Sequence, residues 1–169
     1  MSKHYLHSSF REKLIEHLVI GELLKLSWID GRCALEVAVP EVDRSGYDVI
    51  LEHLGVVRHV QFKASKRDAR TPKQNIQVAL QAKPSACVVW TFFSEETLEL
   101  GPFLFFGNEP GRPMPKLDTF PVAKHTKANA QGEKGERSAL RSVPRSAFRQ
   151  LASSIELWGS LFGDVQQAA

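Results

Sequence analysis

Apolar side chains recur at helical spacing near the start of the chain, and this pattern predicts a first helix over residues 8–26. Ser8 or Ser9 offers an N-cap, and Glu12 stands where a capping box from Ser9 would need it. Gly21 is unfavourable inside a helix and therefore indicates close packing or a bend. The expected apolar face consists of Phe10, Leu14, Ile15, Leu18 and Leu24.

Three short runs rich in β-branched and apolar residues come next. They predict strands at residues 33–39, 47–53 and 56–64. Pro40 ends the first run, and Gly55 marks a turn between the second and third. The sequence therefore predicts an antiparallel hairpin over residues 47–64.

The second half of the chain is less regular. Pro72 suits the first turn of a helix over residues 72–82. Residues 86–93 form a nearly continuous apolar run, which is typical of a strand buried on both faces, and residues 103–106 predict a short strand. We expect residues 107–145, rich in Gly, Pro, Lys and Arg, to form a long loop or arm. The last predicted helix covers residues 146–162.

This order of elements predicts an α/β fold, with one mixed sheet flanked by helices. The 169 residues suit a single domain with one hydrophobic core. No apolar run approaches the roughly 20 residues of a membrane span, and the N-terminus lacks the apolar stretch of a signal peptide. Cys33 and Cys87 sit among apolar residues and lack metal-ligand spacing, so we expect buried thiols rather than a disulfide or a zinc pair. We therefore expect a soluble cytoplasmic protein.

The basic residues are concentrated in two blocks. Residues 57–73 hold six Lys/Arg and one Asp/Glu, a net charge of +5, and residues 112–149 hold nine and three, a net charge of +6. Such blocks suit a polyanion such as nucleic acid, or they are two solvated loops. The candidate phosphate-binding residues are Lys66, Arg67, Arg70, Lys73, Lys124, Lys127, Arg137 and Arg141.

Candidate chemistry lies in the predicted hairpin. Asp48 stands at the start of one strand, and Gln61 and Lys63 project to a single face of the other. Asp48 and Gln61 offer oxygen ligands to a hard cation such as Mg²⁺, and the backbone carbonyl of Phe62 offers another. Lys63 suits contact with an attacking water and a phosphate oxygen. Taken singly, Asp48 also fits an ordinary strand-edge residue, and Lys63 a solvent-facing one.

The segments Gly46-Tyr47-Asp48 and Gln61-Phe62-Lys63, separated by a strand, resemble the signature of the PD-(D/E)xK nuclease superfamily in its Gln-x-Lys form, as found in Mrr-like endonucleases. The resemblance covers residues 8–93. It implies a restriction-endonuclease-like fold and a nuclease that uses Mg²⁺ or Mn²⁺ to hydrolyse phosphodiester bonds in DNA. It also implies a metal-binding Glu on the first helix, for which Gly21-Glu22 is the best match and Glu16 the runner-up.

The chain departs from the usual signature because Tyr47 replaces Pro and Gln61 replaces an acidic residue. The second departure removes one formal charge from the expected metal site. An alternative function therefore remains open, that of a catalytically inactive nucleic-acid-binding or regulatory protein on the same fold. A homodimer, or targeting by a partner protein, also fits. Gln77, on the expected second helix with Gln74 and Gln81, could contact phosphate or simply face solvent.

Overall fold

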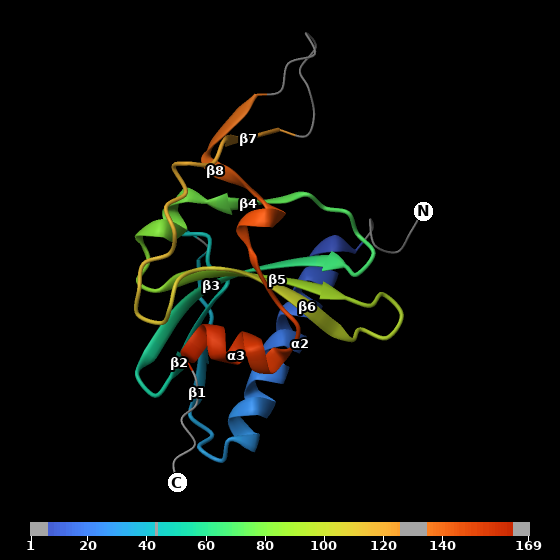
Figure 1. Cartoon of the computed structure of the whole chain (residues 1–169), viewed down its shortest axis with the longest axis vertical. Coiled ribbons are helices and arrows are strands. Elements are labelled where there is room, and N and C mark those ends of the chain that lie inside the picture. Colours follow the sequence, from blue (N-terminus) through green and yellow to red (C-terminus); the bar gives the residue numbers. More distant parts are fainter. Residues whose placement is uncertain (1–6, 43, 126–134, 164–169) are drawn as a thin grey trace.

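The computed structural model describes residues 7–42, 44–125 and 135–163. Its elements are arranged in three layers, with two helices on one face of a six-stranded sheet and a three-stranded sheet on the other (Figure 1). The α/β class expected from the sequence is confirmed. The helices are α2 (Ser8–Ile29) and α3 (Ser154–Phe162).

The large sheet has the strand order β1-β2-β3-β5-β6-β9. β3 and β5 are parallel to each other, and the other neighbouring strands are antiparallel. All eight residues of β5 are buried, as its continuous apolar run predicted. Cys87 on this strand is a buried thiol as expected, but Cys33 is exposed, so the expectation that it is buried is wrong. The strand bounds are β1 (Leu35–Ala38), β2 (Val49–His53), β3 (Val56–Lys66), β5 (Ala86–Phe93), β6 (Leu100–Phe106) and β9 (Arg149–Leu151).

The predicted hairpin is confirmed, since β2 and β3 pair antiparallel with Val49 opposite Val60. Its turn contains Leu54 and Gly55, whose φ angles of 49° and 82° are both positive. Two consecutive positive φ angles match the twist of a tight hairpin, and glycine adopts them without strain.

The prediction of a helix over residues 72–82 is wrong. This segment forms β4 (Lys73–Gln77) and the 3₁₀ helix η1 (Val78–Ala82). β4 pairs along its whole length with β8 (Glu136–Pro144), and β8 also pairs with β7 (Val122–Lys124). Residues 107–145, expected as a long loop, therefore supply two strands of the second sheet.

The last helix is shorter than expected. The 3₁₀ helix η2 (Arg145–Ala147) and β9 precede α3. The Ser153 side chain caps α3 by accepting a hydrogen bond from the Glu156 backbone N–H. The Ser-x-x-Glu pattern of residues 153–156 therefore marks the true start of the helix.

The expected apolar face of α2 is only partly confirmed. Ile15 is buried and Leu18 packs against the core, whereas Phe10 and Leu24 are exposed and the other buried apolar residues are Val19, Ile20 and Leu23. Apolar residues lie on more than one side of this helix, so hydrophobicity alone does not identify the side that packs on the sheet.

Candidate functional site

The hairpin brings Asp48, Gln61 and Lys63 together around one cavity. Asp48 immediately precedes β2, and its backbone N–H donates to the carbonyl of Val60. Val60 and Phe62 pack in the core beneath the helices. Because side chains alternate along a strand, Gln61 and Lys63 face the opposite layer, where β4 lies. The sequence-based expectation that Asp48 and the Gln61/Lys63 pair lie together is thus met.

The carboxylate of Asp48 terminates the hydrogen-bond ladder between β2 and β3. Its Oδ2 accepts a hydrogen bond from the Phe62 backbone N–H at 2.6 Å. The N–H and C=O of one strand residue point to the same side of the strand. The carbonyl of Phe62 therefore faces the same strand edge as Asp48.

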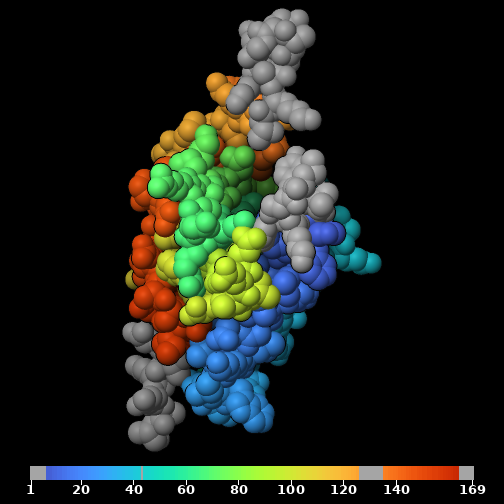
Figure 2. Space-filling view, turned by 90° about the vertical axis from the view of Figure 1, so that its right-hand side faces the viewer, coloured from blue at the N-terminus to red at the C-terminus, as the bar shows by residue number. Residues whose placement is uncertain are grey.

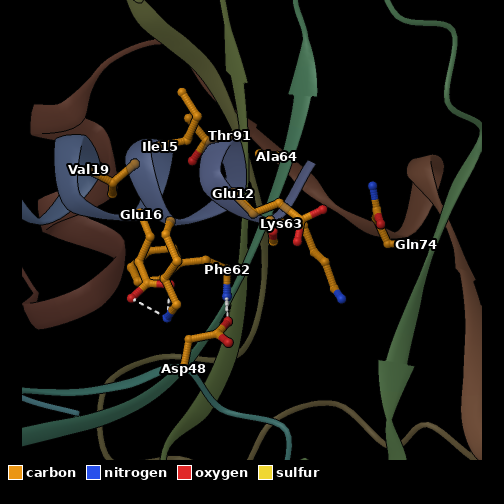
Figure 3. Close-up of a pocket in the computed structure, with 12 residues that line it drawn as sticks. Glu12, Ile15, Glu16, Val19, Asp48, Phe62, Lys63, Ala64, Gln74 and Thr91 are labelled. Atoms are coloured by element: carbon orange, nitrogen blue, oxygen red, sulfur yellow. Dashed lines mark hydrogen bonds and ion pairs between the residues drawn. The ribbon is translucent and has the colours of Figure 1, made fainter. Parts of the chain in front are cut away.

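Two adjoining cavities meet at this edge. One, of about 320 Å³, runs between α2 and the sheet, and Figure 3 shows the side chains around it. The other, of about 670 Å³, opens between β3 and the second sheet. Asp48, Phe62 and Lys63 line both cavities. The second, which we call the cleft, is also lined by Gln61, Lys73, Gln74, Gln77 and Arg137.

The helix acids that line a cavity with Asp48 are Glu16 and Glu12, so the choice of Glu22 is corrected. Glu16 is only 6% exposed and lines the smaller cavity with Asp48. Figure 3 shows it pointing from α2 into this space. Glu22 lines a separate surface pocket with Leu98 and pairs with Lys25 at 3.8 Å. Glu16 and Glu22 are six residues apart, about 600° around the helix, and therefore lie on different faces.

Asp48 lies in surroundings that disfavour its charge. Burial is the main cause that raises the pKa of its carboxyl group, and the negative charge of Glu16 adds to this effect. The Phe62 N–H, followed by the charges of Lys63 and Lys13, acts in the opposite direction. The balance leaves the pKa raised, so a cation placed between Asp48 and Glu16 would be stabilised by both groups.

Gln61 has an unsatisfied polar atom at this position. Its side chain is 6% exposed, and its Oε1 has no hydrogen-bond partner among the residues that the structure describes. A buried carbonyl oxygen without a partner is unfavourable, because it has lost its contact with water. A bound cation would satisfy this oxygen.

These groups fit the Mg²⁺ or Mn²⁺ that the family resemblance implies. Their ligand atoms are oxygens: Asp48 and Phe62 border both cavities, whereas the Glu16 carboxylate borders only the smaller cavity and the Gln61 amide only the cleft. Within residues 7–42, 44–125 and 135–163, no three His, Cys, Asp or Glu side chains group closely enough to hold a metal ion. The site is thus poor in charge and suits an ion that keeps several of its own waters.

The candidate phosphate-binding residues divide into two groups. Lys73 and Arg137 line the cleft. Lys66 and Arg67 instead contact the turn that precedes β6, through ion pairs with Glu95 and Glu99 respectively. Figure 2 shows the green loop that follows β3 packed beside this yellow-green turn, next to the blue helix α2.

The remaining candidates lie on the surface or outside the described residues. Arg70 is exposed in the loop before β4, and Lys124 is exposed at the end of β7. Arg141, on β8, donates to the carbonyls of Ser138 and Leu140. Lys127 lies outside the described residues.

The glutamines of residues 74–81 do not share a helix face. Gln74 and Gln77 belong to β4 and both line the cleft, where Gln77 packs tightly against Gly46. A Cβ at Gly46 would lie 2.6 Å from that of Gln77, and the φ of Gly46 is 77°. The Gln81 side chain instead accepts a hydrogen bond from the Leu117 N–H. Glycine at position 46 thus allows β4 to approach the segment that carries Asp48.

Sequence reasoning missed Lys13 and Thr91, which also line the smaller cavity. It ranked Glu16 second, although a charged residue between the buried Ile15 and Val19 was a usable signal. Nothing in the sequence separates Thr91 from the apolar run around it. Its buried hydroxyl has no hydrogen-bond partner in the described part of the chain.

No protein-family model matches the chain, and no curated protein is significantly similar to it. Among the described residues, no helix is both long enough and apolar enough to cross a membrane.

Proposed function

We propose that this protein is a metal-dependent nuclease of the PD-(D/E)xK type, with a restriction-endonuclease-like fold, that hydrolyses phosphodiester bonds in DNA. The convergence of Asp48, Gln61 and Lys63 beside one cleft carries this proposal. The layered mixed sheet and the acidic residue contributed by the first helix support it.

Four groups would hold the ion: the carboxylates of Asp48 and Glu16, the amide oxygen of Gln61 and the carbonyl of Phe62. Mg²⁺ or Mn²⁺, when bound, supplies positive charge beside the scissile phosphate and makes a nearby water easier to deprotonate. Buried Gln61 fixes one ligand position, because it pairs with Val88 of β5 and follows directly on Val60, the last residue of β3 paired with β2.

Lys63 performs the second role. Its ammonium lies close enough to Asp48 to lower the pKa of that carboxyl group. A cation in this position donates hydrogen bonds to the attacking water and to a phosphate oxygen, and it offsets the negative charge that develops during hydrolysis. Lys73 and Arg137, across the cleft, would bind neighbouring phosphates of the same DNA strand.

A second function, that of an inactive nucleic-acid-binding or regulatory protein on this fold, is favoured by one observation. Gln61 is neutral where the commoner signature has an acid, so the site has fewer charges with which to hold a metal. Such a protein would retain the basic residues of the cleft and would lack only the ability to hydrolyse phosphodiester bonds.

Calorimetry with Mn²⁺ separates the two functions. The nuclease requires binding that is lost in Asp48→Ala and weakened in Glu16→Gln. Glu22→Gln is the matched control on the same helix and should bind as the wild type does. Intact DNA binding together with no Asp48-dependent Mn²⁺ binding would favour the inactive protein instead.

A further inference from the structure

Glu16, the buried acid of the site, already has a cationic partner. The Nζ of Lys13 lies 3.0 Å from Oε1 and 2.9 Å from Oε2 of Glu16. Both residues line the smaller cavity with Asp48, and the dashed lines at the labelled Glu16 in Figure 3 mark this ion pair. The ammonium thus lies against both oxygens that a divalent cation would need.

The two partners differ sharply in exposure to solvent. The Glu16 side chain is 6% exposed, whereas that of Lys13 is 58% exposed. A buried carboxylate without a counter-charge is strongly unfavourable. A lysine reaching in from solvent on a flexible stem provides that counter-charge and can leave without disturbing the core.

The charge of Lys13 also reaches the principal ligand. Glu16 raises the pKa of Asp48, and Lys13 lowers it. Lys13 therefore partly neutralises the carboxylate pair in the way that a metal ion would.

We propose that Lys13 is an internal counter-cation that holds Glu16 in the metal-free protein and competes with the divalent ion for it. Metal binding would then exchange one cation for another at Glu16, and the lysine side chain would move toward solvent. Lys13 is thus a positioning residue that sets metal affinity. This inference rests on the proposed metal site.

The same helix provides a matched control. Lys25 pairs with Glu22 at the same sequence spacing, but at 3.8 Å and with both side chains well exposed. Removing Lys25 makes the same change in net charge, away from Asp48.

The test is Mn²⁺ calorimetry on Lys13→Met, Lys13→Arg and Lys25→Met. Loss of a competing ion pair should tighten binding in Lys13→Met by about fivefold, the scale of a partly exposed pair. Lys13→Arg keeps the charge and should stay near the wild type, as should Lys25→Met. Unchanged or weaker binding in Lys13→Met would overturn the inference, as would an equal gain in Lys25→Met.

A double-mutant cycle shows whether the effect passes through Glu16. In a Glu16→Gln background, Lys13→Met should tighten binding much less, because only the weaker effect of Lys13 on Asp48 remains. An undiminished gain would overturn the competition. If wild type binds Mn²⁺ in a way that depends on Asp48, but the Lys13 variants bind it equally well, this inference alone is contradicted. If wild type binds no Mn²⁺, the proposed function is overturned as well.

Discussion

Asp48 accepts a 2.6 Å hydrogen bond from the backbone N–H of Phe62, so its carboxylate occupies the position that the next paired residue of β2 would take. The bond fixes the carboxylate beside the exposed edge of β3. It also brings into one cavity the side chain and the backbone carbonyl that we expect to bind metal.

Asp48→Asn should stabilise the metal-free protein near neutral pH. The pKa of Asp48 is raised in the folded state, mainly by burial, so the charged form is disfavoured there. The protonated carboxyl group of Asp48 therefore stabilises the folded state. This stabilisation is complete below the ordinary pKa of 3.8 and is lost as the pH rises from that value through the raised pKa of the folded state. Asparagine removes the charge and can still accept the Phe62 N–H. A gain on the order of 1 kcal/mol is expected at pH 7.

Denaturant unfolding in EDTA at several pH values measures this gain. The difference between Asp48→Asn and wild type should shrink toward zero as the pH falls below 3.8. Asp118→Asn, on the exposed surface, serves as the control. A less stable Asp48→Asn at pH 7, in a folded variant, would show that the charge of Asp48 is stabilising.

Gln61→Glu should keep or raise the affinity for Mn²⁺. The Gln61 Oε1 is buried and has no partner within the described residues, and a carboxylate there adds a negative charge near the ion. The same charge, in the cavity that Asp48 lines, should destabilise the metal-free protein. Calorimetry and thermal melts with and without Mn²⁺ measure the two effects. Weaker binding by a folded Gln61→Glu variant would argue that Gln61 is not a ligand.

Residues 112–149 should contribute phosphate contacts without sequence specificity. Replacing Lys124, Lys127 and Arg137 with Ala should weaken binding to all DNA sequences alike. The slope of log K against log salt should flatten by up to about three units if each residue makes one contact. Lys25→Ala supplies the control. If slope and affinity stay unchanged, the nucleic-acid surface is confined to residues 63–73.

The hairpin and its site could be predicted because their signals are local. The two-residue alternation around Gln61 and Lys63 fixes a face, and Gly55 fixes the turn that brings Asp48 alongside. The eight apolar residues of β5 identify a strand buried on both sides. These features depend on neighbours along the chain or on one short connection.

The second sheet could not be predicted in this way. β4 has a helix-like sequence after Pro72, and its strand form depends on pairing with β8, far along the chain. Tertiary pairing of this kind overrides local propensity. Gln74 and Gln77 therefore reach the cleft from a strand, although a helix was expected.

The choice between Glu16 and Glu22 failed for a different reason. Helix α2 carries apolar residues on its exposed side as well, including Phe10 and Trp28. Its packing face was therefore ambiguous, and the Gly-Glu resemblance of residues 21–22 decided in favour of the wrong face.

Cleavage of labelled DNA tests the central claim most directly. Wild type, Asp48→Asn and Lys63→Ala should be compared on duplex and single-stranded substrates with Mg²⁺, with Mn²⁺ and with excess EDTA. We predict cleavage by wild type only when the divalent ion is present, and a loss of about 100-fold or more in each variant, the usual effect of removing one transition-state contact. Cleavage that survives EDTA, or variants that are folded and cut as well as wild type, would contradict the account.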